Sequence, residues 1–203
     1  MNFEHIIEGS FKKIEFEPGE LAFLAATSKI ERPIQDRLSW RLQQALQDHD
    51  VIREWNMGGG RRKVDITVLK DESPVAVIEL TAMYTFDAAL EKHMQFVAKI
   101  SGDEQKALKL VGPDVPIFTI LLAAHPKPSN PERMKSFVKY DDIKKSLRTA
   151  TCDEVAAAAD RKVRDSFLAK APRNLAFRHI VRGIGESFSI PFDIHVWCFR
   201  FVP

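Results

Sequence analysis

The sequence predicts an α/β fold in which a mixed central β-sheet is flanked by helices. Three observations lead to this prediction. Two neighbouring segments, 61–69 and 75–81, are rich in Val and Ile and are joined by a short polar turn, as in a pair of β-strands. The apolar segment 115–124 is bounded by prolines and is typical of a buried central strand. Amphipathic segments of helical period precede and follow these strands, an order typical of one sheet covered by helices.

The first helix of this core is indicated by a proline. Residues 1–27 have the character of an irregular, weakly structured lead-in, and Pro33 is suited to the first turn of a helix that extends to about residue 48, with Thr27 or Ser28 as its cap. The elements predicted after it are, in chain order, a strand at 51–55, the strands at 61–69 and 75–81, a helix at 86–100, a helical segment at 103–110 after a break at Ser101-Gly102, the strand at 115–124, helices near 131–148, 153–170 and 173–182, and a closing strand at 192–202.

This order predicts a single domain over residues 1–203. Its core is a helix, three strands, a helix and a strand at about 28–124, followed by a helical insertion and closing strand at 125–203. The second part holds 15 Lys and Arg against 9 Asp and Glu. Such a basic region could follow nucleic-acid phosphates, or its charges could belong to solvated helix faces.

Composition limits the class of protein. Hydrophobic residues make up 45% of the chain and charged residues 29%, which is ordinary for a globular protein. No apolar run approaches the length of a membrane span, and the N-terminus lacks the pattern of a signal peptide. The two cysteines, Cys152 and Cys198, fit no zinc spacing and indicate a reducing compartment. We therefore expect a cytoplasmic protein without a membrane partner.

Two acidic residues, Asp65 and Glu79, interrupt the two apolar strands. A buried carboxylate must be hydrated, paired or bound to a metal, because burying a bare charge is costly. Side chains alternate along a strand, so Lys63 shares the face of Asp65 and Thr81 shares the face of Glu79. A three-residue loop at 71–73, or a bulge, places Asp65 across from Glu79 and Lys63 across from Thr81, whereas a two-residue loop without a bulge separates the acids. Opposed Cβ atoms are about 5 Å apart, which suits a shared divalent cation.

The preceding helix supplies a third acid. By helical periodicity Glu31 lies near the centre of the apolar stripe that faces the sheet, with Gln35 at the edge of this stripe, while Asp36 points to solvent. Glu31 is therefore a candidate site residue and Gln35 a possible neighbour. The alternative for Glu31 is an N-terminal acid stabilised by the helix dipole.

The arrangement resembles the PD-(D/E)XK nuclease superfamily, the restriction-endonuclease-like proteins. Val64-Asp65 corresponds to the Pro-Asp position of the motif, and Glu79-Leu80-Thr81 corresponds to the acid-x-Lys position. The resemblance covers about residues 28–124 and implies a restriction-endonuclease-like core. It also implies metal-dependent hydrolysis of DNA, with Mg²⁺ or Mn²⁺ held by Asp65, Glu79, the carbonyl of Leu80 and Glu31.

Thr81 stands where the motif has a lysine. In such nucleases this lysine positions the attacking water, and we expect Lys63 to replace it from the neighbouring strand. Lys92 is a weaker substitute and a candidate nucleic-acid contact, and His93 is either a site neighbour or an ordinary core histidine. Without a replacement lysine, the same fold would bind nucleic acid or act as a scaffold without cutting it. An enzyme of another class that uses the acids without a metal is a further alternative.

A glycine-rich turn at 58–60 precedes Arg61 and Arg62, which we expect to contact a nucleic-acid backbone, although a plain hairpin turn is the alternative. The expected partner is DNA, with RNA as the alternative. Cutting both strands of a duplex requires two sites, so the expected assembly is a homodimer.

Overall fold

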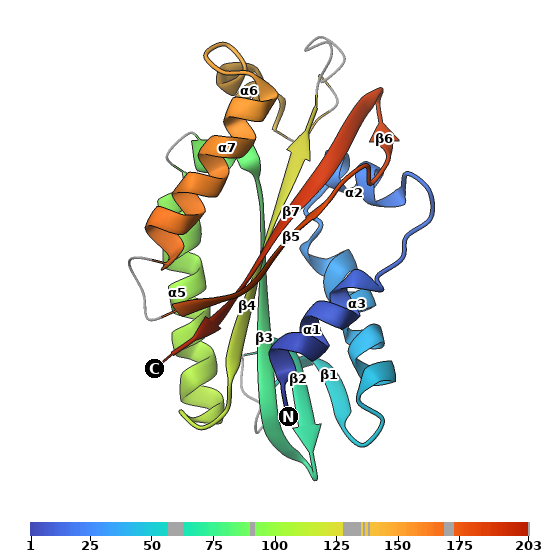
Figure 1. Cartoon of the computed structure of the whole chain (residues 1–203), viewed down its shortest axis with the longest axis vertical. Helices are drawn as coiled ribbons and strands as arrows, with labels where there is room; N and C mark the ends of the chain where they lie inside the picture. The colour runs from blue at the N-terminus through green and yellow to red at the C-terminus, as the bar shows by residue number, and fades with distance from the viewer. Residues whose placement is uncertain are drawn as a thin grey trace.

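An open, mixed β-sheet flanked by helices forms the protein (Figure 1), as seen in a computed structural model that describes residues 1–56, 63–89, 92–127, 135, 137, 139–168 and 173–202. The helices are α1 (Phe3–Lys12), α2 (Glu20–Thr27), α3 (Glu31–Ala45), α4 (Thr85–Ala89), α5 (His93–Val111), α6 (Tyr140–Ser146), α7 (Cys152–Lys162) and the π-helix η2 (Val163–Leu168). The strands are β1 (Asp50–Trp55), β2 (Val64–Lys70), β3 (Ser73–Tyr84), β4 (Ile117–Pro126), β5 (Arg173–Val181), β6 (Glu186–Ser187) and β7 (Ile190–Phe201).

The seven strands of the described residues are ordered β1-β2-β3-β4-β7-β5, with the short β6 paired to β7. β3 and β4 are parallel, and all other neighbouring strands are antiparallel. The predicted α/β class with a mixed sheet is therefore confirmed. From α3 to β4 the elements are a helix, three strands, the helices α4 and α5, and a strand, which is the order that the sequence predicted.

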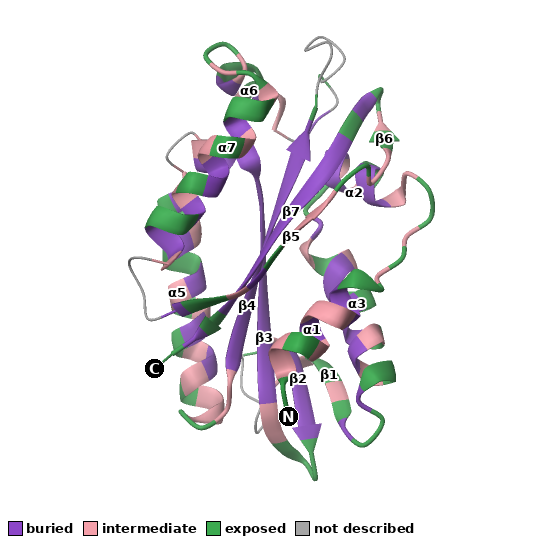
Figure 2. Ribbon diagram, in the orientation of Figure 1, coloured by how far each residue is buried: buried purple, intermediate pink, exposed green. Residues whose placement is uncertain are grey.

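Successive side chains of the central strands point to opposite faces of the sheet, and each face packs against a layer of helices. Ile78 and Ile120 lie in one buried cluster with Leu38 of α3, whereas Leu121 lies in a second cluster with Ile100 of α5. In Figure 1 the first layer, α1 to α3, lies on one side of the sheet, and α5 and α7 lie on the other. Figure 2 shows that β3, β4 and β7 are buried along most of their length. The sheet is thus covered on both faces, and a charged side chain on β3 must find a partner there.

The lead-in at 1–27 was predicted to be irregular, and this prediction is wrong. It contains α1, which begins after Asn2 because the Asn2 side chain accepts a hydrogen bond from the backbone N–H of His5. Ile7 and Phe11 of α1 are buried against the sheet layer. Leu21, Ala22, Ala25 and Ala26 of α2 are buried in the same cluster, so packing stabilises both helices despite their short length.

α3 begins at Glu31 and has Pro33 in its first turn, as predicted, but its predicted cap is wrong. Thr27 and Ser28 belong to the end of α2, where the Ser28 hydroxyl donates to the carbonyl of Leu24. The cap position of α3 is Ile30, which makes no side-chain capping hydrogen bond. The first turn of α3 is therefore held by packing and by Glu31 itself.

α5 is continuous through Ser101 and Gly102, so the predicted break is wrong. A glycine inside a helix costs about 1 kcal/mol relative to alanine. Ile100 and Ala107 are fully buried on either side of Gly102, and their packing outweighs that cost.

The helix predicted at 173–182 is also wrong, because this segment is the edge strand β5. Arg173, its first residue, is buried and pairs with Glu104 of α5 through two contacts of 2.6 Å, Nε to Oε1 and Nη2 to Oε2. Arg173 also donates to the carbonyl of Phe167. This distant ion pair fixes the start of β5 beside β7, the closing strand that the sequence predicted.

The remaining helical predictions are confirmed in part. α7 and η2 cover most of the predicted helix at 153–170, and α6 lies within the segment near 131–148. Within the described ranges, no helix has the length and apolar character needed to cross a bilayer.

Candidate active site

The hairpin between β2 and β3 has a two-residue loop and a bulge. Asp71 and Glu72 adopt left-handed backbone conformations, with φ of 48° and 62°, as in the tight turns that suit the twist of paired strands. The register then shifts between Val68 and Leu69, because β3 contributes one extra residue, Val75. The predicted three-residue loop is therefore wrong. The bulge adds one residue to β3, so the two strands have the same relative register beyond it as a three-residue loop would give them.

Beyond the bulge, the ladder ends with Ile66 paired to Ile78. Asp65 and Glu79 are the next residues on the two strands, so their side chains lie on the same face of the hairpin. The predicted opposition of the two acids therefore follows from the observed register.

β3 extends past the end of this ladder, and carboxylates satisfy its exposed backbone. The Asp65 Oδ2 atom accepts a hydrogen bond of 2.7 Å from the backbone N–H of Leu80. The Glu31 Oε2 atom accepts one of 3.1 Å from the N–H of Ala82. The structure thus brings Glu31, Asp65 and the Glu79–Thr81 segment together at the opening between β2 and β3, as the sequence predicted.

Glu79 is the most deeply buried acid of this group, with 2% of its surface exposed. Burial, reinforced by the negative charge of Asp65, raises the pKa of Glu79 to about 8, and Lys106 opposes this shift. The Lys106 ammonium lies 3.0 Å from Glu79 Oε1 and 3.2 Å from Asp103 Oδ1. Burial also raises the pKa of Asp65, against the effect of the Leu80 N–H. On these two adjacent strands the cost of burying the carboxylates therefore outweighs the attraction of Lys106, as is common at functional sites.

The lysine beside Thr81 comes from α5. Lys99 Nζ donates to Thr81 Oγ1 at 2.8 Å and lies 3.4 Å from the carbonyl oxygen of Leu80. It also lies 3.9 Å from Glu31 Oε2 and 3.4 Å from Asp103 Oδ2. An ammonium group from α5 therefore contacts the side chain of Thr81 on β3.

Sequence reasoning missed Lys99, Asp103 and Lys106, which form one face of α5. Their spacing of four and three residues is the signal that could have found them, because such residues share a helix face. The break predicted at Ser101-Gly102 divided this pattern into two unrelated segments.

Lys63, the lysine predicted to replace the missing one, is not the residue whose amine is seen to contact Thr81. It is exposed and precedes the first residue of β2, and the amine that contacts Thr81 belongs to Lys99. Lys92 pairs with Asp142 of α6 at 2.8 Å, an ion pair that joins the start of α5 to α6. Among the described residues, this ion pair directs the Lys92 amine to α6 and not to Asp65 or Glu79.

Gln35 lies at the site as predicted. It is 4% exposed, and its side-chain amide donates to the backbone carbonyl of Asp65 at 2.6 Å and to Glu54 Oε1 at 3.3 Å. It therefore fixes the backbone that carries the Asp65 carboxylate. His93 is buried at the first residue of α5. Arg61 and Arg62 lie outside the described residues.

The donor set suits a cation that keeps part of its water shell. Among the described residues, no group of three or more His, Cys, Asp or Glu side chains could hold a metal ion. Asp65, Glu79 and the carbonyl of Leu80 are nevertheless oxygen ligands of the kind that Mg²⁺ takes, and Mg²⁺ is commonly bound through one or two carboxylates with several waters. Within the described residues, Glu79 Oε1 is buried and accepts no aligned hydrogen bond. Among the described residues, the amines that contact the Glu31, Glu79 and Asp103 carboxylates are Lys99 and Lys106. With Asp65 and an ionised Glu79 included, the four carboxylates exceed these two amines by two negative charges.

Comparisons of this chain with models of known protein families, with curated proteins and with solved structures found no match. Its function is therefore inferred from the carboxylates, the lysines and their surroundings.

Proposed function

We propose that the protein hydrolyses phosphodiester bonds of nucleic acid, DNA in the first place, with a divalent cation held by Asp65 and Glu79. The observation that supports this most strongly is that two carboxyl groups with raised pKa values, Asp65 and Glu79, lie on adjacent strands next to Thr81, which Lys99 contacts. Acids on adjacent strands followed by an ammonium group are also what the resemblance to the PD-(D/E)XK nucleases implies. A restriction-endonuclease-like core is part of the same proposal.

The cation would be Mg²⁺ or Mn²⁺, with the carbonyl of Leu80 as a further ligand and Glu31 holding a bound water. When present, it would polarise the scissile phosphate and lower the pKa of a bound water. The two negative charges in excess at this site match its charge, and ionisation of Glu79 becomes favourable once a cation offsets the repulsion from Asp65.

Lys99 takes the role that the sequence gave to Lys63. Its ammonium group is oriented by Thr81 Oγ1 and by Asp103, and it projects toward the Leu80 carbonyl. From there it can hold the attacking water in place and stabilise the negative charge that develops on the phosphate oxygens. Thr81 acts as a positioning residue for this amine.

Another observation favours a second candidate function. Asp65 and Glu31 both accept hydrogen bonds from the backbone of β3, and Lys106 pairs with Glu79, so each acid has a structural partner. A protein that binds nucleic acid on this fold without cutting it would need the same contacts.

Cleavage of circular DNA separates the two candidates. The wild-type protein with Mg²⁺ or Mn²⁺ is expected to convert supercoiled plasmid or single-stranded circular DNA to open or linear forms, and Asp65→Asn and Glu79→Gln are expected to abolish this. The matched control is Asp114→Asn, a change at an exposed acid. Undiminished cleavage by both site variants would overturn the site assignment, and binding of either DNA without any cleavage would favour the second candidate. The predicted homodimer is checked by sedimentation of the same preparation.

A further inference from the structure

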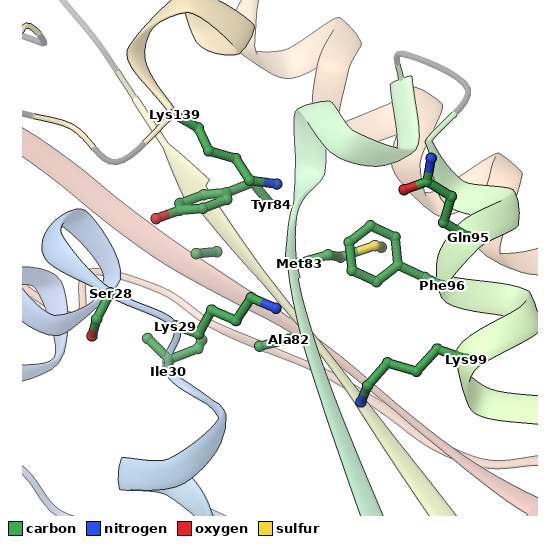
Figure 3. A pocket seen from close by; sticks show the side chains of 11 residues that line it. Ser28, Lys29, Ile30, Ala82, Met83, Tyr84, Gln95, Phe96, Lys99 and Lys139 are labelled. Carbon is green, nitrogen blue, oxygen red and sulfur yellow. The ribbon is translucent and has the colours of Figure 1, made fainter. Parts of the chain in front are cut away.

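A cavity of about 370 Å³ lies beside the carboxylate site. It is enclosed by the segment between α2 and α3, the C-terminal half of β3, the first turns of α5 and Lys139 (Figure 3). Lys99 belongs both to this cavity and to the carboxylate site. Ala82, which lines the cavity, is the residue whose N–H is bound by Glu31. The two features therefore share one continuous stretch of β3.

The interior of this cavity is apolar. Its buried lining residues are Ile30, Ala82, Met83, Tyr84 and Ala124. Phe96 of α5 is half-buried and presents an aromatic ring at the wall, next to Met83 (Figure 3). A flat apolar ligand group would gain both burial and aromatic stacking there.

The rim of the cavity is positively charged. Three lysines line it, and none of the described lining residues is acidic. Figure 3 shows Lys29 extending toward β3 from the segment between α2 and α3, and Lys99 extending toward the same strand from α5. Lys139 is already paired with the buried Asp87, and Lys99 with Glu31 and Asp103. Lys29 is exposed and, within the part of the chain that the structure describes, forms no ion pair, so its charge is available for an anion.

An apolar, aromatic interior with a cationic rim matches one nucleotide. A volume of about 370 Å³ is at the lower end of the range for ligand sites, about 300 to 1,000 Å³, which admits one base with its sugar but not a duplex. Bases inside a duplex are stacked and cannot present their faces to a protein ring, whereas every base of a single strand can.

We propose that this cavity binds one unstacked nucleotide of a single-stranded nucleic acid. The base packs against Phe96 and Met83, and Lys29 holds a flanking phosphate. Because Lys99 is shared with the carboxylate site, the bound strand leads from the cavity to Asp65 and Glu79. This assignment names the substrate of the proposed nuclease and rests on the proposed function for the cleavage step, but binding by the cavity does not depend on cleavage.

The test measures binding in EDTA, where no cleavage can occur. A fluorescent oligothymidylate of about 15 nucleotides, within the site sizes known for single-strand binding, is titrated with protein and followed by anisotropy. The wild type is expected to bind it at least about tenfold more tightly than a duplex of the same length. Phe96→Leu keeps apolar volume but removes the ring, and it should weaken binding by about 5- to 100-fold, the effect of one stacked base. Phe96→Tyr should restore binding.

Lys29→Ala is expected to weaken single-strand binding. It should also make the plot of log K against log salt less steep, by the amount expected for the loss of about one phosphate contact. The controls are Phe23→Ala, which removes an exposed ring outside the cavity, and Lys109→Ala, an exposed lysine near the other end of α5. Circular dichroism and thermal unfolding of each variant show that the fold is retained.

The outcomes separate this inference from the proposed function. Tighter binding to the duplex, or unchanged single-strand binding by both Phe96→Leu and Lys29→Ala, overturns the cavity assignment even if the protein cuts DNA. Weakened binding by these two variants, with unchanged controls, supports it even if no cation induces cleavage.

Discussion

Replacing Glu79 by glutamine should stabilise the protein at alkaline pH. The pKa of Glu79 is raised from 4.5 to about 8 by burial and by Asp65, so the folded state holds a proton that the unfolded chain has already lost. Ionising Glu79 in the folded state therefore lowers the free energy of unfolding. This loss is absent below about pH 4.5, grows as the pH rises, and is complete above about pH 8. Since one pKa unit corresponds to about 1.4 kcal/mol, the ionised carboxylate costs on the order of 3–5 kcal/mol.

Glutamine has nearly the shape of the protonated acid and carries no charge, so Glu79→Gln should recover most of this cost, about 3 kcal/mol at pH 9. For a chain of this length that gain raises Tm by roughly 6–12 °C. At pH 4.5 the two proteins should differ by less than about 0.5 kcal/mol. Thermal and urea unfolding followed by circular dichroism in EDTA measure both values, with Asp114→Asn as the control. A Glu79→Gln protein that is no more stable than wild type at pH 9, or equally stabilised at both pH values, would refute the conclusion that burial of the ionised Glu79 carboxylate destabilises the fold.

Three further predictions concern other parts of the structure. Lys99→Met should lower DNA cleavage by at least about 100-fold while Tm changes by only a few degrees, because the amine is exposed and acts on the developing charge; a kcat close to that of wild type would contradict this role. Arg173→Met should lower the free energy of unfolding in urea by about 3–5 kcal/mol, because it leaves the buried Glu104 carboxylate unpaired, and a loss below about 1 kcal/mol would contradict it. Burial lowers the pKa of His125 from 6.5 to about 4, so the unfolded chain binds the proton first, and stability is lost as the pH falls from about 6.5 to 4. His125→Gln should flatten the stability profile in that window, and an unchanged slope would show that the histidine is not buried in its neutral form.

The carboxylate pair could be predicted from sequence because it breaks a strong local pattern. Acids inside Val- and Ile-rich strands are conspicuous, and the alternation of side chains limits their relative placement to two cases. The choice between those cases depended on the bulge at Val75. Pro74, which cannot donate to the ladder, precedes Val75 and is compatible with a bulge, but it does not by itself fix the register. The opposition of Asp65 and Glu79 could therefore be stated only as a condition.

The position of Lys99 and the strand β5 could not be predicted, because both depend on contacts between residues that are distant in the sequence. Lys99 is brought to Thr81 by a helix that continues through Gly102, and local propensity at that glycine favoured a break. β5 begins at Arg173 because its guanidinium pairs with Glu104, 69 residues away, while the local sequence suits a helix equally well. In both cases tertiary packing overrode the local preference, and single-sequence patterns do not contain that information.

The position of a bound cation tests the proposed site most directly. Crystals soaked in Mn²⁺ and measured at the manganese absorption edge would give an anomalous peak only where the ion binds. We predict one peak within coordinating distance of Asp65, Glu79 and the Leu80 carbonyl, about 2.0–2.5 Å from their oxygens, and its loss in Glu79→Gln crystals. No peak at these residues, with Glu79 still paired to Lys106, would contradict a metal-dependent nuclease and leave the acids as structural partners of the β3 backbone.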